Sequence, residues 1–227
     1  MRRVLTILTI ALLPGWAFAG AWPREVGTTF VSLSFTAKGD PTTMTTTGFP
    51  QESFSTLYVE HGLMPRLTVG LDAGYSQAGD YSVLAFASRP VGPGDAKNRF
   101  ALEAGAGVWD SGRQSDTVLH FGLDYGRGIS TGLGDGWVAV DTAVQYRVSL
   151  QEVIYKADLT VGLATGKRTK IMMQLQAGDY PGSEAYVRLA PSITRQFGPR
   201  TQLELGLEAG VIGDSRIGLK LGTWFEF

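Results

Sequence analysis

The sequence contains no cysteine, only two histidines and, after residue 19, no apolar run long enough for a membrane-spanning helix. The lack of cysteine excludes a disulfide framework and a lipid-modified cysteine anchor. Two histidines without cysteine leave few ligands for a transition-metal site. A membrane helix needs roughly 20 consecutive apolar residues. A membrane location would therefore require a closed β-barrel, because open sheet edges cannot face lipid.

Charge is also scarce: charged residues make up 18 % of the chain, and the formal net charge is -1. This balance indicates no strongly charged partner, so we expect no nucleic acid to bind. Hydrophobic residues reach 44 %, yet the mean hydropathy is only +0.03. Barrels conceal their membrane character in this way, because lipid-facing and lumen-facing residues alternate and cancel. The 30 glycines also fit an all-β chain better than a helical one.

Residues 1–19 have the features of a cleaved signal peptide. Arg2 and Arg3 form a charged start, residues 4–13 are apolar, and Ala17-Phe18-Ala19 is a small-x-small cleavage site. We therefore expect export, with Gly20 as the first residue of the mature chain. Residues 20–227 show no domain boundary and are expected to form one barrel domain. A short arm, residues 20–25, precedes the first strand.

The last twelve residues alternate strictly between an apolar and a polar face. Ile217, Leu219, Leu221, Phe225 and Phe227 share one face, while charged residues and glycines share the other. This two-residue period is typical of a β-strand with one face toward an apolar phase.

Eleven earlier segments repeat the length and alternation of the last one. The expected strands are 28–37, 53–62, 66–77, 81–90, 99–109, 119–126, 138–147, 155–163, 170–178, 187–194, 202–211 and 216–227. About ten residues per strand is the length that crosses a bilayer at a tilt. The segment 81–90 alternates poorly, because residues 83–87 are all apolar. Pro191, at a mid-strand outward position, predicts a bulge or a local edge.

The terminal strand resembles the carboxyl-terminal signature of Gram-negative outer-membrane β-barrels, a porin-like class. The signature is a final Phe, an aromatic or apolar residue two positions before it, and alternation back from there, as in Phe227 and Phe225. The resemblance implies a bacterial outer-membrane location and contact with outer-membrane lipid. It also implies that Phe225 and Phe227 are an assembly signal for the barrel assembly machinery. No subfamily is indicated.

Connections and aromatic residues fit this class. With both termini periplasmic, the periplasmic connections are 63–66, 91–98, 129–136, 165–168 and 197–200. The outward aromatics then fall in two girdles, Tyr75, Tyr146 and Tyr155 near the outer rim and Phe100, Tyr125, Phe197, Phe225 and Phe227 near the inner rim. The longest outer connection, 38–52, is rich in threonine. It is either a solvated loop or a constriction loop folded into the mouth.

The inward face carries charges of both signs. The candidate pore-lining residues are Asp72, Arg99, Glu103, His120, Asp124, Asp141, Arg147, Lys156, Asp158, Arg188, Glu204, Glu208, Arg216 and Lys220, with Glu60, Arg89 and Lys170 on the same predicted face. Unpaired ions in a dry core would cost several kcal/mol each. The face is thus either a polar pore lining or an ion-paired network that blocks the lumen. Many inward glycines favour an open lumen, and Arg216 and Lys220 are expected to face Glu204 and Glu208.

Enzymatic interpretations are poorly supported. His61 and His120 are not followed by a serine two residues later, which a lipid-modifying barrel enzyme of the phospholipase or deacylase type would show. The segment 132–136 is rich in glycine but lacks the Lys-Ser/Thr of a phosphate loop. We expect no cofactor and no metal. The sequence favours a passive channel for small polar or charged solutes. The alternative is a structural or interaction barrel with a blocked lumen, and an enzyme comes a distant third.

Overall fold

The computed structural model describes residues 20–94 and 96–227, so the predicted signal peptide lies outside the described residues. No helix in the described part is long and apolar enough to cross a membrane. The described chain is almost entirely strand, with one helix of four residues, α1 (Met44–Thr47). This all-β content agrees with the predicted fold class.

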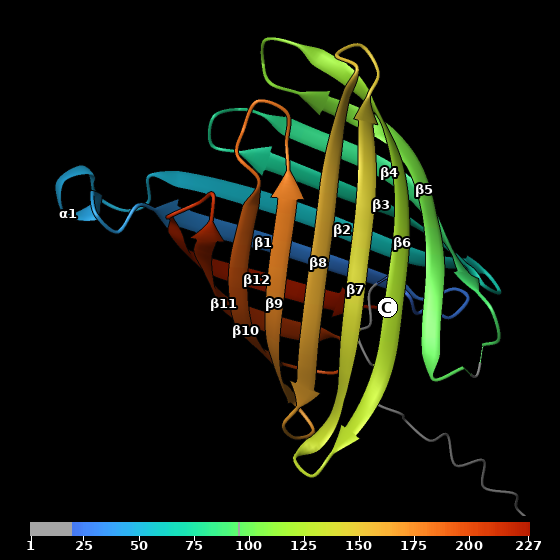
Figure 1. Ribbon diagram of the computed structural model, residues 1–227. Coiled ribbons are helices and arrows are strands. Elements are labelled where there is room, and N and C mark those ends of the chain that lie inside the picture. The colour runs from blue at the N-terminus through green and yellow to red at the C-terminus, as the bar shows by residue number, and fades with distance from the viewer. Residues whose placement is uncertain (1–19, 95) are drawn as a thin grey trace, which may run out of the picture.

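Twelve antiparallel strands form one closed barrel, as the sequence predicts (Figure 1). The strands are β1 (Thr29–Gly39), β2 (Glu52–Met64), β3 (Leu67–Ser76), β4 (Tyr81–Val91), β5 (Asn98–Asp110), β6 (Ser115–Thr131), β7 (Gly134–Arg147), β8 (Glu152–Ala164), β9 (Thr169–Asp179), β10 (Tyr186–Gln196), β11 (Thr201–Ile212) and β12 (Ile217–Glu226). Each strand pairs with its neighbours in sequence, and β12 pairs with β1 to close the ring.

The closing seam depends on the terminal residue. In register, Phe30 lies opposite Glu226 and Gly39 opposite Ile217. Beyond the last strand residue, Phe227 N–H donates to the Thr29 carbonyl at 2.9 Å, and Thr29 N–H donates to the Phe227 carbonyl at 3.1 Å. The predicted pairing of the last segment with 28–37 is therefore confirmed.

The predicted faces are largely confirmed. Outward side chains such as Phe121 and Leu207 are 62 % and 57 % exposed, as expected for a surface that meets lipid rather than a core. The segment 81–91 is the exception. Leu84 and Phe86 point inward and are buried, while Arg89 is exposed on the outward face. The placement of Arg89 in the lumen was wrong, because the apolar run hid the phase of the strand.

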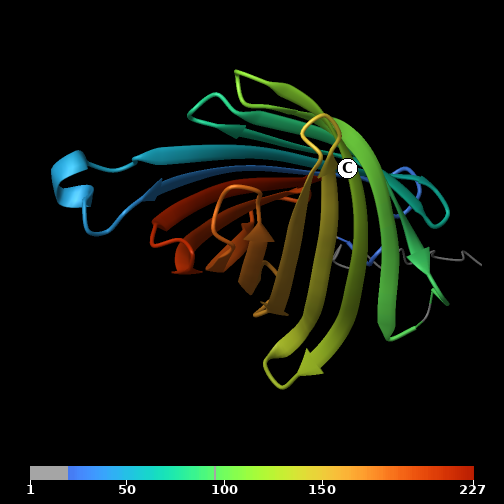
Figure 2. The same cartoon turned by 45° about the horizontal axis from the view of Figure 1, so that its top comes forward.

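The two mouths of the barrel differ. We call the end that carries both termini the terminal mouth, which is periplasmic in outer-membrane barrels, and the opposite end the distal mouth. At the terminal mouth, β6 and β7 form a long hairpin that turns at residues 132–133, so most of the predicted turn 129–136 is strand. At the distal mouth, the threonine-rich connection is mostly exposed, and α1 projects away from the barrel (Figures 1 and 2). This arrangement fits the solvated-loop interpretation.

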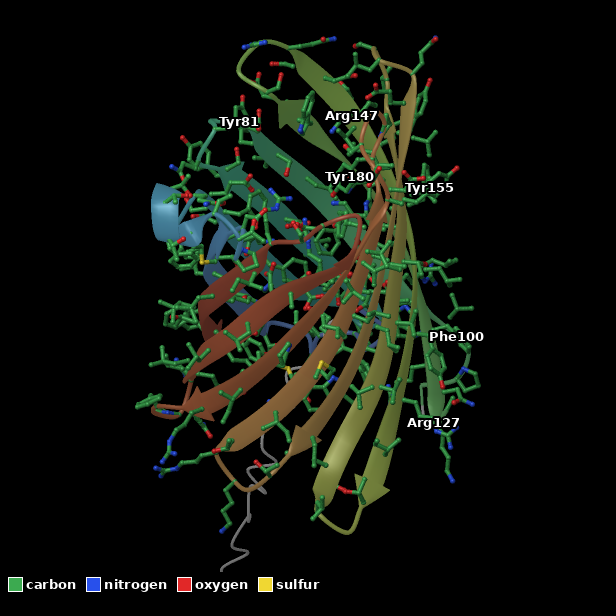
Figure 3. The ribbon with its side chains drawn as sticks, turned by 60° about the vertical axis from the view of Figure 1, so that its left-hand side comes forward. Tyr81, Phe100, Arg127, Arg147, Tyr155 and Tyr180 are labelled. Carbon is green, nitrogen blue, oxygen red and sulfur yellow. The ribbon has the colours of Figure 1, made fainter. Side chains whose placement is uncertain are left out.

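Aromatic residues mark both rims of the outer surface. Tyr75 and Tyr155 are exposed near the distal mouth, and Phe100, Phe197 and Phe227 near the terminal mouth. Figure 3 shows Tyr81 and Tyr155 in the upper half and Phe100 in the lower half of the barrel. Two such aromatic bands, one at each rim, are the pattern that membrane barrels present to the two lipid interfaces.

The β10–β11 ladder is interrupted at Pro191. Pro191 pairs with Met173 of β9, but the pairing of β10 with β11 skips from Leu189 to Ser192. Proline has no N–H to donate on that side. The register shift in the same ladder lies at Val187 and Arg188. The pairs on either side of Pro191 keep the same register, so Pro191 interrupts the ladder without a bulge, and the bulge lies instead at Val187 and Arg188.

Candidate functional site

The candidate site is the lumen, whose largest hollow opens at the distal mouth. This cavity, which we call the vestibule, measures about 860 Å³. Its charged lining residues are Lys38, Glu52, Asp80, Glu184, Arg188, Asp214 and Arg216. Phe54, Tyr180 and Tyr186 add aromatic surface to the same cavity. The vestibule therefore offers ionic, hydrogen-bonding and aromatic groups to a polar solute.

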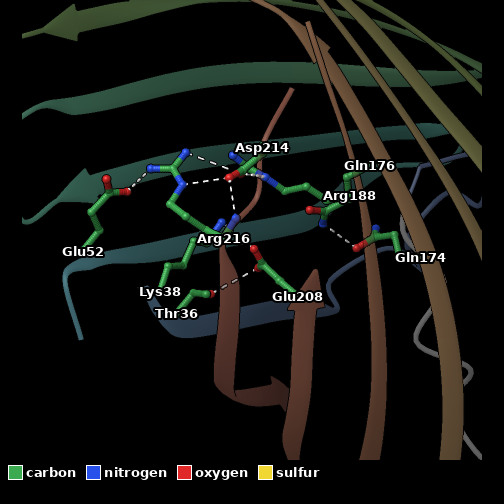
Figure 4. Close-up of polar contacts among 9 residues, drawn as sticks. All are labelled: Thr36, Lys38, Glu52, Gln174, Gln176, Arg188, Glu208, Asp214 and Arg216. Carbon is green, nitrogen blue, oxygen red and sulfur yellow. Dashed lines mark hydrogen bonds and ion pairs between the residues drawn. The ribbon is translucent and has the colours of Figure 1, made fainter. Parts of the chain in front are cut away.

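Asp214 organises the charges on one side of the vestibule. Arg188 Nε donates to Asp214 Oδ2 at 2.7 Å, and Arg216 Nε donates to Asp214 Oδ1 at 2.8 Å (Figure 4). Arg216 also pairs with Glu52 of β2. Burial would raise the pKa of Asp214, but the hydrogen bonds from Arg216 and Arg188 outweigh it and hold this pKa well below its usual range. Asp214 is thus ionised throughout the physiological pH range.

The predicted pairing of Arg216 and Lys220 with the acidic residues of β11 is half right. Lys220 Nζ lies 3.1 Å from Glu204 Oε1. Glu208 instead pairs with Lys38 of β1 at 2.5 Å, while Arg216 turns to Asp214 and Glu52. The side chain of Lys38 on β1 crosses β12 to reach Glu208 on β11. These ion pairs therefore connect β12 with both of its neighbouring strands.

A second cavity of about 180 Å³ continues the vestibule toward the middle of the lumen. It shares Phe54, Asp80 and Tyr180 with the vestibule, and Asp72, Arg147 and Lys156 line it farther along. The guanidinium of Arg147 lies 3.8 Å from the centre of the Trp109 ring. Several of the predicted lining residues thus line two adjoining cavities.

Carboxylates dominate the middle of the lumen. Asp124, Asp141 and Asp158 lie directly opposite one another on β6, β7 and β8, and all three point inward. His120 Nε2 lies 2.7 Å from Glu103 Oε1, and both side chains are largely buried. Like charges directly opposite on neighbouring strands destabilise a sheet. This acidic ladder, defined as Asp124, Asp141 and Asp158, therefore needs compensating charge.

Inward aromatic rings cover several of the inward glycines. A side-chain carbon added at Gly162 would collide with the Trp137 ring, and one added at Gly70 would collide with Phe86. Phe86 in turn stacks on Tyr58, with ring centroids 5.7 Å apart. The expectation that inward glycines leave the lumen open is wrong at these positions. The glycines are needed because the rings lie flat against the strand backbone.

The segment before β1, residues 20–27, which we call the arm, enters the barrel with residues 20–24, which sequence reasoning missed. Residues 25–27 are exposed. The Ala21 side chain is fully buried, and Arg24 lies between inward residues, with its Nη2 2.6 Å from Glu60 Oε2 and its Nη1 3.5 Å from Glu226 Oε1. Arg24 N–H also donates to Thr68 Oγ1 at 3.0 Å. The arm thus narrows the lumen at its terminal half, and no periodic signal announces it.

The other predicted lining residues lie on the inward face, with different partners. Arg99 is half-buried near the terminal mouth, and Arg147 pairs with Glu152 at 3.3 Å. Lys156 lies 5.9 Å from the Tyr180 ring.

His61 lies on the outward face, where its Nδ1 is 2.9 Å from Thr29 Oγ1. Among the described residues, no group of three or more His, Cys, Asp or Glu has the geometry to hold a metal ion.

Comparison with known proteins relates the chain to outer-membrane barrels through its structure. No known protein family and no curated protein match the sequence. The KdgM porin superposes with a TM-score of 0.60 at 10 % identity, over 86 % of this chain and 99 % of its own. An outer membrane channel from Pseudomonas putida F1 gives 0.55 at 12 % identity, over 92 % and 98 %. The beta domain of the Bordetella autotransporter BrkA gives 0.52 at 12 % identity, over 89 % and 100 %.

Fold, girdles and closing strand together define the class: the chain has the architecture of bacterial outer-membrane β-barrel proteins. Porins, a channel and an autotransporter domain share this fold at 10–12 % identity. A fold held in common by such different proteins does not specify function, which has to be argued from the lumen.

Proposed function

We propose that this protein is a passive outer-membrane channel for small polar or charged solutes. The observation that carries the proposal is the pair of adjoining polar cavities in the distal half of the lumen. The vestibule of about 860 Å³ and the inner cavity of about 180 Å³ share three lining residues and are lined by charged and hydroxyl groups. A lumen built only to stiffen the barrel would have no reason to keep a polar hollow of this size.

The composition of the inner lumen favours cations over anions. In the central section, the inward carboxylates of Asp72, Glu103 and Asp158 outnumber the ammonium group of Lys156, and His120 lies against Glu103. A passage lined by charge of one sign raises the local concentration of counter-ions. Small solutes that carry a positive group should therefore enter more readily than anions. The KdgM porin, which shares the fold, has been solved in complex with oligogalacturonate.

A second candidate function, the structural barrel with a blocked lumen, is supported by the ion pairs and the arm. The described residues contain nine ion-pair contacts, and Arg24 holds the arm across the terminal half of the lumen.

Single-channel recording separates the two functions. Purified, folded protein in a planar bilayer should give discrete unitary conductance steps under a channel function. A heat-dependent shift in gel mobility verifies that each sample is folded. A correctly folded protein that inserts and remains electrically silent would contradict the channel and favour the blocked barrel.

A further inference from the structure

Two carboxylate oxygens of the acidic ladder lack any partner. Asp124 Oδ2 and Asp141 Oδ1 are buried, and neither makes a hydrogen bond. Asp124 is only 5 % exposed. The residues directly opposite them in the ladder are themselves acidic, since Asp124 faces Asp141 and Asp141 faces Asp158. An unpaired buried carboxylate is costly, so the pair calls for a positively charged group that donates hydrogen bonds.

The first residue of the arm lies against this pair. A side-chain carbon added at Gly20 would collide with the Asp141 carboxylate and lie 3.4 Å from Asp124 Cβ. The Gly20 nitrogen is two bonds from that position, which places it within about 5 Å of the Asp141 oxygen. Arg24, held by Glu60, fixes the other end of the arm. The backbone of Gly20 is therefore positioned where the missing cation would have to lie.

Cleavage of the predicted signal peptide would create that cation. Hydrolysis breaks the Ala19–Gly20 peptide bond, with the hydroxyl of water going to the Ala19 carbonyl and a proton to the Gly20 nitrogen. The new amine takes up a further proton near neutral pH and becomes an ammonium group with three N–H donors. Before cleavage, the same nitrogen is an uncharged amide with a single donor.

We propose that Asp124 and Asp141 form a docking site for the α-ammonium group of Gly20, and that this contact holds the arm across the lumen. The inference rests on cleavage after Ala19 and is independent of whether the barrel conducts. Glycine suits this position because any side chain would occupy the space of the Asp141 carboxylate. The mature amino terminus thereby becomes part of the lumen wall.

The test uses the full processed protein purified from outer membranes, with intact mass confirming Gly20 as its first residue. The folded protein and a urea-denatured sample are treated with an amine-acylating reagent, and mass spectrometry follows the amino-terminal peptide. An ammonium held by two carboxylates should be acylated at least about tenfold more slowly in the folded protein. The double variant D124N/D141N keeps the shape of the site without its charge and should recover most of the rate of the denatured sample.

Asp158→Asn is the matched control, because it removes a carboxylate of the same ladder that lies one strand farther from Asp124. It should leave acylation slow. Equal protection in D124N/D141N would show that burial alone shields the amine and would overturn the proposal, as would fast acylation of the folded native chain or a mature chain that begins elsewhere.

A second variant keeps the test decisive if D124N/D141N fails to fold. An alanine inserted between Gly20 and Ala21 moves the amine out of place and leaves both carboxylates and Arg24 intact. Its acylation should be faster than that of the native chain by the same factor. An inserted variant that folds and remains fully protected would contradict the proposed site.

Discussion

At the scale of single residues, the lumen is held together by ion pairs that differ in burial. The Arg24–Glu60 pair is the most secluded, with side chains 7 % and 2 % exposed. Removing one member of such a pair leaves an uncompensated charge, whereas removing an exposed ion costs little. Burial, rather than the number of pairs, decides which substitutions matter.

Replacing Arg24 with methionine should therefore lower the free energy of unfolding by about 3–5 kcal/mol, because Glu60 would remain buried and unpaired. Urea unfolding of the protein in lipid vesicles measures the change. Arg127→Met removes an exposed arginine of β6 and serves as the control, with an expected change within about 0.5 kcal/mol. Equal effects of the two substitutions would contradict the assigned role of Arg24.

Asp214 should make the distal mouth insensitive to mild acid. Its lowered pKa means that its contribution to stability is present above the unfolded value of about 3.9 and is lost as the pH falls through the folded value. Asp214→Asn should lower the free energy of unfolding by about 1–3 kcal/mol at pH 7 and equally at pH 5. Below about pH 4, the difference between the native protein and the variant should shrink.

Urea titrations at pH 7, 5 and 3 test this prediction. Asp179→Asn, at the exposed end of β9, is the control and should change little at any of these pH values. A difference between the native protein and D214N that stays the same from pH 7 to pH 3 would show that Asp214 has an ordinary pKa, because equal pKa values in the folded and unfolded states give no pH dependence.

At the scale of elements, the alternation of apolar and polar residues was enough to predict every strand. It failed in extent at the long β6–β7 hairpin, and in phase at β4, where Leu84 and Phe86 point inward. A large apolar residue fits there because Gly70 and Gly105 lie opposite Phe86 on the neighbouring strands. The period of a single strand does not contain this information, since the space is provided by the partners.

The terminal strand should be the element most sensitive to truncation. Deleting Phe227 removes both backbone hydrogen bonds to Thr29 and the exposed aromatic ring that resembles an assembly signal. We expect the folded, heat-modifiable fraction in isolated outer membranes to fall severalfold, as measured by gel mobility without boiling. Phe197→Ala, an aromatic of the same rim, should leave that fraction nearly unchanged. Normal assembly without Phe227 would show that the seam closes through the other pairs alone.

At the scale of the whole molecule, the sequence predicted which residues share the lumen but not which of them meet. The sequence analysis paired Lys220 with Glu204 correctly because the two residues lie on adjacent strands. Lys38 and Glu208 lie at opposite ends of the chain and meet only through the register of the closed ring. The position of the arm inside the barrel was missed for a different reason. Residues 20–27 show no periodic alternation of apolar and polar residues, and the proposed position of their amino terminus depends on the carboxylates of Asp124 and Asp141.

The charge of the inner lumen predicts ion selectivity. In a salt gradient at 0.1 M, the reversal potential should indicate a preference for cations, and the preference should weaken at 1 M, where screening acts over about 3 Å. The variant D72N/D158N should reduce the cation-to-anion permeability ratio by about twofold or more. Asp135→Asn, on the exposed β6–β7 hairpin, is the control. Anion preference in the native protein would contradict the proposed role of the acidic section.

The position of Arg24 also bears on the order in which the molecule is made. Its two carboxylate partners come from β2, near the start of the chain, and from β12, its final strand. The contact with Glu60 needs only the β1–β2 hairpin, whereas the contact with Glu226 also needs β12, the last strand of the ring. The contact with Glu226 therefore requires the closed ring, and it adds a side-chain link across the seam between β1 and β12.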